Sequence, residues 1–288
     1  MNFFVKGAFD RADKHLAFLL KKSRSAVQFY FKSGYVTLNG GLVKASTLIG
    51  EGAILTVNFP TKNLDEEVNY ARPVIPILFE DQEVVVINKP AGVLSQVVTG
   101  SPEYCVGQLL QKQGIALAGG EDNDRIGLVH RLDRFTEGLM VLTKNKNVWT
   151  ALKKQFSQRL IKKKYYALVY GNVTPSFMTI LKPLVRHPSQ RQRYVVAKNG
   201  RDSETHVTRL KSFQTKTLLS LQPTTGRTHQ LRVHLASVGH AIIGDPVYAK
   251  KKGDGQLLQA YYLSFWHPVL KKNICIELKL SSRLCMRC

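Results

Sequence analysis

Gly127-Leu-Val-His-Arg-Leu-Asp-Arg-Phe-Thr-Glu-Gly-Leu-Met-Val-Leu-Thr143 joins a charged turn to a short run of apolar residues. The run, Leu139 to Leu142, predicts a buried strand. Asp133 lies in the turn between Arg131 and Arg134, and nearby positive charge favours its ionised form. An ionised carboxylate at the mouth of a buried strand suits nucleophilic or electrostatic work. On composition alone, an aspartate that only pairs structurally with a neighbouring arginine is the alternative.

This motif resembles the active-site motif of the RluA-type pseudouridine synthases, in which HRLD is followed two residues later by threonine and then by Gly-Leu. Two further stretches, Lys163–Gly171 and Pro223–Ala236, resemble the same family and lie in its expected order. The resemblance extends from about residue 77 to about residue 280. Glu137 departs from the pattern, because the family usually has a small serine at this position.

The resemblance implies an α+β catalytic domain with a mixed, largely antiparallel sheet, and strand-rich stretches with few helices agree with it. It implies that uridine in RNA is isomerised to pseudouridine without a cofactor, and the sequence offers no site for one. The target base must leave its stack, which favours basic surfaces and aromatic platforms. By resemblance, Asp133 is the catalytic aspartate, Arg227 the arginine that pairs with it, and Tyr165 the tyrosine that stacks on uracil.

Several other residues are expected to contact RNA. In the catalytic part, charge or place in the motifs selects Arg131, Arg134, Gln230, Arg232 and Lys163. A helix is expected to open at Thr225-Gly226-Arg227 and to end at Gly239, with Gln230 and His234 on the same face as Arg227. Residues 182–201 are basic and irregular and predict a loop that reaches RNA. Residues 144–164 contain eight basic residues and no acid, which also favours phosphate contact.

The N-terminal residues predict a small separate unit. Helical spacing over 13–20, a second helix capped by Ser23, and a hairpin through Asn39-Gly40-Gly41 resemble the αL-type RNA-binding module of a small-subunit ribosomal protein. By that resemblance Arg24, Lys32 and Asn39 would face RNA; a helical cap with a solvated basic face is the alternative. The expected organisation is an RNA-binding domain over 1–60, a linker over 61–76 and the catalytic domain over 77–288.

The net charge supports a polyanionic partner. The chain has 42 lysines and arginines against 20 acids, a formal charge of +22. Such an excess predicts binding that weakens as salt is added. No apolar run approaches about 18 residues, and no basic helix has a continuous apolar face, so a membrane is not expected. The expected partner is RNA, with ribosomal RNA of the large subunit ahead of tRNA.

The cysteines and the first residues bear on location. Four cysteines are sparse usage that suits a reducing compartment, and the N-terminus lacks the apolar core of a secretory signal. We therefore expect a cytoplasmic protein, and a monomer. Cys285 and Cys288 form half of a zinc motif, and no metal site is expected.

Two other functions stay open at this stage. One is a catalytically silent RNA-binding or ribosome-assembly protein on the same fold, which the charge of Glu137 would suit. The other is a heparin- or membrane-surface-binding protein that uses charge alone, against which the three ordered motifs argue.

Overall fold

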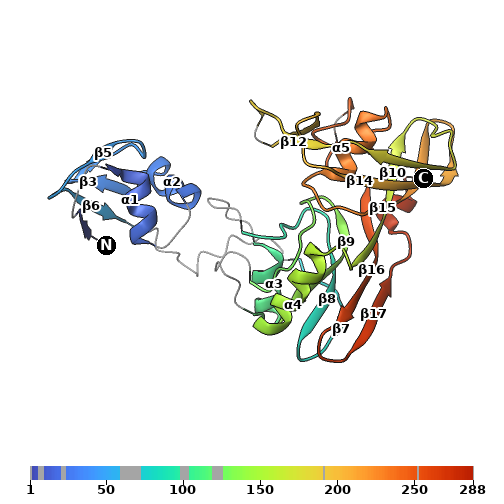
Figure 1. The fold of residues 1–288 in the computed structure, drawn as a ribbon, viewed down its shortest axis with the longest axis horizontal. Helices are drawn as coiled ribbons and strands as arrows, with labels where there is room; N and C mark the ends of the chain where they lie inside the picture. The colour runs from blue at the N-terminus through green and yellow to red at the C-terminus, as the bar shows by residue number, and fades with distance from the viewer. Residues whose placement is uncertain are drawn as a thin grey trace. The chain divides into compact units, whose positions relative to one another are not determined.

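The chain forms two units in this computed structural model, one from the described residues up to 58 and one from the described residues after 72 (Figure 1). The expected linker over 61–76 lies almost entirely outside the described residues, so its limits stay a prediction. The structure describes residues 2–5, 10–20, 24–58, 73–97, 104–118, 126–190, 192–251 and 253–287.

The N-terminal unit packs two helices on a small sheet around a shared core. Leu16, Val27 and Leu55, from the two helices and the sheet, are fully buried. The sheet has the order β1-β6-β3-β4, and β2 pairs with β5. The hairpin through Asn39 and the strand over 54–57 are confirmed, whereas Ser23 lies outside the described residues. The elements are β1 (Asn2–Phe4), β2 (Asp10–Arg11), α1 (Ala12–Leu19), α2 (Arg24–Lys32), β3 (Val36–Leu38), β4 (Gly41–Leu42), β5 (Leu48–Ile49) and β6 (Ile54–Val57).

The second unit is built on a nine-stranded sheet of order β11-β14-β15-β10-β16-β9-β8-β7, with β17 also paired to β16. All these pairings are antiparallel except β9 with β16, so the predicted mixed, largely antiparallel sheet is confirmed. The strands are β7 (Ile77–Glu80), β8 (Val84–Lys89), β9 (Glu137–Thr143), β10 (Lys162–Tyr170), β11 (Phe177–Leu181), β14 (Glu204–Ser212), β15 (Lys216–Pro223), β16 (Leu258–His267) and β17 (Lys272–Glu277).

Strand β9 contributes side chains to both hydrophobic clusters of the second unit, as its continuous apolar run predicts. Met140 and Leu142 belong to one core cluster, and Leu139 and Val141 to the other, because alternate side chains of a strand point to opposite faces. Helices α3 (Val106–Lys112) and α5 (Gln230–Ser237) contribute leucines to the first cluster. Helix α4 (Lys146–Ser157) contributes Val148 and Leu152 to the second.

Gly138 allows the one parallel pairing of this sheet. It has φ of +110°, and a Cβ there would lie 2.2 Å from the carbonyl oxygen of Ala260. A side chain is therefore excluded by both backbone conformation and contact. The pairing of Glu137 and Gly138 with Gln259 and Ala260 brings the chain out of the 130–136 turn directly beside β16.

Two expectations about local structure are wrong. Residues 182–201 are not an irregular loop, because β12 (Leu184–Arg186) and β13 (Tyr194–Val196) pair as an antiparallel hairpin. The helix expected from Thr225 begins only at Gln230, since His229 takes a left-handed φ of 56° that interrupts it. A short helix, α6 (Ser282–Cys285), follows the last strand. In the described part of the chain, no helix has the length and apolarity to cross a membrane.

Candidate active site

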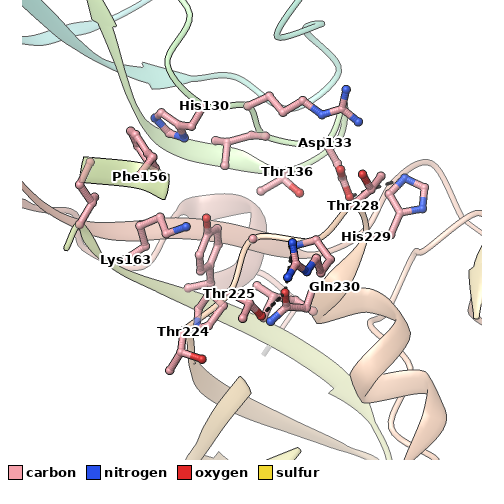
Figure 2. A pocket seen from close by; sticks show the side chains of 18 of the residues that line it. His130, Asp133, Thr136, Phe156, Lys163, Thr224, Thr225, Thr228, His229 and Gln230 are labelled. Atoms are coloured by element: carbon pink, nitrogen blue, oxygen red, sulfur yellow. Dashed lines mark hydrogen bonds and ion pairs between the residues drawn. The ribbon is translucent and has the colours of Figure 1, made fainter. Parts of the chain in front are cut away.

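A cavity of about 570 Å³ lies in the second unit, and five segments line it (Figure 2). They are the turn over 129–136, the end of α4 with the residues after it, the start of β10, the stretch from the end of β15 into α5, and Leu258 at the start of β16. Figure 2 shows Asp133 and His229 next to each other at one side and His130 and Phe156 at the other. The two sequence motifs that contain Asp133 and Gln230 thus face the same space.

Asp133 is held by Arg232. Nη1 of Arg232 donates to Oδ2 of Asp133 at 2.9 Å, while Nε and Nη2 donate to the two carboxylate oxygens of Asp245 at 2.7 and 2.9 Å. The side chains of Arg232 and Asp245 are 5% and 0% exposed, whereas that of Asp133 is 22% exposed. One buried guanidinium therefore bridges a buried carboxylate and one that reaches the cavity.

The charges of this triad support one another. Burial disfavours the charge of Arg232, but the bonds to Asp245 and the charge of Asp133 outweigh burial and raise the pKa of the guanidinium. Burial likewise disfavours the carboxylate of Asp245, yet the bonds from Arg232 and from the N–H groups of Val247 and Tyr248 lower its pKa. Arg232 thus remains a cation that keeps Asp133 oriented.

The expected pairing of Arg227 with Asp133 is wrong, since Arg232 makes that ion pair. Arg227 precedes the helix and lines the cavity, with Nε donating to the carbonyl of Asp202 at 3.1 Å. Burial lowers its pKa, and the nearby positive charges of Arg201 and Arg159 lower it further. Arg227 is therefore one of several cations at the cavity that are close enough to repel one another.

Tyr165 lies where the motif predicts, on the cavity wall in β10, and is 8% exposed. Burial, followed by the negative charge of Asp133, raises the pKa of Tyr165 well above its usual value, so its phenol keeps its proton at neutral pH. Lys163, two residues earlier on the same face, also lines the cavity, and burial lowers its pKa. An aromatic ring and an amine thus stand side by side on one strand.

His130 and Phe156 form a stacked pair on the cavity wall, with ring centroids 4.7 Å apart. Nε2 of His130 accepts the N–H of Val141 at 3.1 Å, which requires that nitrogen to be unprotonated. Burial, and then the charge of Lys163, lowers the pKa of His130 to about 3. His130 is therefore a neutral structural group that ties the turn to β9.

The other expected RNA contacts of this unit divide into two kinds. Arg131 is exposed and lines the cavity, whereas Arg134 is exposed but donates to the carbonyl of Gly92 at 3.1 Å. Gln230 is buried, and its amide bonds Thr225, Arg227, Glu204 and Thr205. Gln230 therefore organises the loop before α5, and because it also lines the cavity its contact with RNA stays a prediction.

His234, expected on an exposed polar face, is also buried. Its ring bonds the hydroxyls of Ser203 and Thr205 at 2.9 Å each. Burial lowers its pKa, so it is a neutral link between α5 and the start of β14.

The sequence analysis did not predict that Lys89 and Ser95 hold the turn that bears Asp133. Lys89, the last residue of β8, is fully buried and donates to the carbonyls of Pro90, Val93 and Arg134 at 2.8, 2.8 and 2.9 Å. Ser95 donates to the carbonyl of Leu132 and accepts its N–H. Burial lowers the pKa of Lys89 to about 7, against the charges of Asp133 and Glu137. A lysine at the end of a strand that begins with four apolar residues was the available signal.

Glu137 does not line the cavity. Its carboxylate accepts the hydroxyl of Ser281 at 2.7 Å and lies 4.0 Å from a guanidinium nitrogen of Arg283. The departure from the family pattern is thus accommodated by Ser281 and Arg283, outside the lining of the cavity.

The three residues expected to face RNA in the N-terminal unit have different settings. Arg24 donates to the buried carboxylate of Asp13 at 3.0 Å, although half of its side chain is exposed. Asn39 accepts the N–H of Ile54 at 2.9 Å and adopts a left-handed φ of 49°, so it shapes the hairpin. Lys32 is exposed at the end of α2.

Comparison with known proteins agrees with this geometry. Residues 83–237 match the family model described as RNA pseudouridylate synthase. An "uncharacterized RNA pseudouridine synthase" of Aquifex aeolicus is 35% identical over 97% of this chain and 93% of its own length. A "ribosomal large subunit pseudouridine synthase D" of Xylella fastidiosa is 34% identical over 96% and 87%.

A solved structure shares the fold. The human RNA pseudouridylate synthase domain containing 1 aligns with a TM-score of 0.61 at 22% identity, over 71% of this chain and 83% of that chain. The family match contains Asp133, Tyr165 and Arg232, which are the residues that meet at the cavity. The chain therefore belongs to the RNA pseudouridylate synthase family and is an RNA pseudouridine synthase.

Proposed function

We propose that Asp133 is the catalytic carboxylate and that it acts on a uridine extruded into the cavity. The observation that carries this proposal is the ion pair of Asp133 with the buried Arg232, which orients the carboxylate at the wall of a space large enough for a nucleotide. The carboxylate attacks or electrostatically stabilises the uridine while uracil detaches, rotates and rejoins through carbon 5. The proposal includes attack at the base and attack at the sugar.

Tyr165 supports the extruded base in this proposal. Its ring lies on the cavity wall and offers uracil a face to stack on, in place of the neighbours that the base loses in RNA. Because its pKa is raised, the phenol is protonated and can donate a hydrogen bond to the base. Stacking on Tyr165 would offset part of the cost of extrusion, which is roughly a few kcal/mol.

The cations at the cavity bind the phosphates on either side of the target. Arg131, Lys163 and Arg227 line the cavity from three segments, and Arg159 lines it from the turn after α4. Within the described residues none of these four forms an ion pair with a carboxylate. Free guanidinium and ammonium groups around a base-sized cavity fit a phosphodiester backbone that passes its mouth.

We infer that the substrate is ribosomal RNA of the large subunit, and that the N-terminal unit binds RNA too. Support comes from the Xylella fastidiosa relative, which is named a large-subunit synthase, and from the net charge of +22. Mapping pseudouridines in total RNA of cells with and without the gene tests this inference. Loss of a pseudouridine from tRNA alone would contradict it.

Release of tritium from RNA labelled at uracil carbon 5 tests the catalytic role. Asp133→Asn keeps the shape and removes the charge, so we expect the rate to fall at least about a hundredfold, the usual contribution of a group that acts directly. Asp254→Asn, at an exposed site outside the cavity, is the matched control and should keep full activity. Unchanged release by Asp133→Asn would remove this residue from the reaction.

A further inference from the structure

Two hydrogen bonds join the β12–β13 hairpin to His229, and the ring of His229 lies near the carboxylate of Asp133. The backbone N–H of Tyr194 donates to the phenol oxygen of Tyr248 at 2.9 Å. That phenol lies 2.9 Å from Nδ1 of His229. On the other side of the ring, Nε2 lies 4.0 Å from Oδ2 of Asp133 (Figure 2). The ring of His229 thus connects the far side of the cavity wall with Asp133.

The first two bonds decide which nitrogen of His229 carries the proton. Since the phenol oxygen of Tyr248 accepts the N–H of Tyr194, the phenol proton is free to be donated, and Nδ1 of His229 is placed to accept it. A protonated Nδ1 would leave that phenol proton, in a largely buried group, without its acceptor. Nδ1 is therefore the acceptor, and Nε2 carries the hydrogen that faces Asp133. Burial also lowers the pKa of His229, which favours this neutral ring.

His229 stands at the N-cap of α5, but its side chain does not cap the helix. Its backbone has a left-handed φ of 56°. Glycine and asparagine adopt this conformation more readily than histidine does. A residue that is suboptimal for the backbone is thus placed where its imidazole reaches the catalytic carboxylate.

Tyr248 touches both groups that hold Asp133. Its ring lies 5.1 Å from the guanidinium carbon of Arg232, and its backbone N–H donates to Asp245 at 3.0 Å. The rings of Tyr194 and Tyr248 also meet the ring of His229 edge-on, with centroids 5.8 and 5.7 Å away. The imidazole is therefore held in place on both sides.

Arg232 and His229 both face Oδ2 of Asp133. Oδ2 accepts from Arg232 and faces His229, whereas Oδ1 accepts no hydrogen bond from the described residues. We propose that His229 is a positioning residue, which directs its Nε2–H at Oδ2 of Asp133 and thereby presents Oδ1 to the uridine. This inference rests on the proposed catalytic role of Asp133. At 4.0 Å the interaction is electrostatic rather than a full hydrogen bond, so its loss should slow the reaction without abolishing it.

Three substitutions of His229 separate this role from a backbone role. His229→Gly and His229→Asn suit the left-handed backbone but lose the N–H near Asp133, whereas His229→Gln is less suited to the backbone and can return an amide N–H to that position. We expect kcat for pseudouridine formation to fall roughly ten- to hundredfold in the Gly and Asn variants, as for a slightly misplaced reacting group. His229→Gln should recover several-fold over these two. KM and RNA affinity should stay within about twofold, because binding of RNA phosphates is untouched.

Tyr248→Phe tests whether the phenol proton of Tyr248 fixes the tautomer of His229. It keeps the ring beside Arg232 but removes the proton donor to His229, so kcat should fall in the same direction as in His229→Asn. In a His229→Gln background it should have little further effect, since the two residues act through one interaction. His206→Asn and Tyr170→Phe, which lie outside the cavity, are matched controls and should match the wild type.

The outcomes separate the two proposals. Wild-type protein that forms no pseudouridine, or an active Asp133→Asn variant, would contradict the proposed catalytic site. An active wild type with His229→Asn and His229→Gly at full kcat would overturn the positioning role, as would a His229→Gln variant slower than both. If a His229 variant fails to give a cooperative urea transition, Tyr248→Phe decides by itself, because full kcat in that variant contradicts the proposal.

Discussion

Asp133 gains its setting from residues that are far apart in the chain. Its carboxylate pairs with Arg232, which lies 99 residues later, and its own turn is held from below by Lys89 and Ser95. The HRLD motif was sufficient to predict an aspartate beside the cavity. It was not sufficient to predict the partner, because the motif over 223–236 contains two candidate arginines.

The choice between those arginines depends on where the helix starts. Arg227 lies before the left-handed His229, whereas Arg232 lies in the first turn of α5, on the side that faces Asp133 and Asp245. If the helix is assumed to begin at Thr225, Arg227 falls on its polar face and is the expected partner of Asp133. Because the left-handed backbone at His229 delays the start of the helix to Gln230, Arg232 takes that place instead.

His130 predicts a specific response to acid. Its pKa is about 3 in the folded protein and near 6.5 in the unfolded chain, so between these values only the unfolded chain binds the proton. The stabilisation is complete above pH 6.5 and is lost as the pH falls. His130→Gln keeps an acceptor for the N–H of Val141 but does not titrate. Between pH 7.5 and pH 5 the wild type should lose on the order of 1 kcal/mol more unfolding free energy than the variant.

Urea unfolding at the two pH values measures this difference. The same comparison with His206→Gln, at a half-buried histidine outside the cavity, controls for the replacement of a histidine elsewhere in the sheet. Parallel losses in the wild type and His130→Gln would mean that His130 is not kept neutral by the fold.

At the scale of elements, hydrogen bonds tie the end of β8 to the turn over 129–136 that bears Asp133. Lys89 supplies three hydrogen bonds to carbonyls, and the N–H of Gly92 also donates to the carbonyl of Arg134. Lys89→Met keeps the length of the side chain and leaves three carbonyls without their donor. We expect an unfolding free energy lower by about 2–4 kcal/mol, since unmet buried polar groups cost about 1–3 kcal/mol each and partial relaxation offsets some of the loss.

Urea denaturation of Lys89→Met, with Lys272→Met at an exposed position of β17 as control, measures this cost. Activity at a temperature where the variant is still folded should also fall, because the turn that carries Asp133 is no longer tied to β8. A stable Lys89→Met with full activity would show that Ser95 and the backbone suffice to hold the turn.

The elements differ in how far their sequence predicts them. Strand β9, α4 and the hairpin through Asn39 follow from hydrophobic periodicity and turn residues, which are local signals. The strands of the β12–β13 hairpin have only three residues each and lie within a basic segment, so the local pattern is too short to predict them. Contacts elsewhere, such as the bond from Tyr194 to Tyr248, help to hold the hairpin. The parallel pairing of β9 with β16 joins segments too distant for any local pattern to predict.

At the scale of the whole molecule, the charge of +22 and the division into two units suggest recognition of RNA by more than one surface. Of the residues predicted to face RNA in the N-terminal unit, Lys32 is the one that the described structure does not use for a fold contact. Lys32→Gln should raise the Kd for a long ribosomal RNA fragment about two- to fivefold and reduce the dependence of binding on salt. The kcat at saturating RNA should not change.

Filter binding at several salt concentrations measures both effects, with a short stem-loop that carries only the target uridine as the comparison RNA. Lys44→Gln makes the same charge change at another exposed position of the same unit. Equal losses in the two lysine variants would indicate general attraction rather than a defined RNA-binding surface.

The contacts of Arg283 link the catalytic turn to one of the last segments of the chain. Its guanidinium donates to the carbonyls of Phe135, Gln256 and Gly255, and Ser281 holds Glu137. A nascent polypeptide that has been translated past Asp133 but not past residue 283 lacks the three hydrogen bonds of Arg283. The turn that bears Asp133 therefore gains its full set of contacts only once residue 283 has been synthesised.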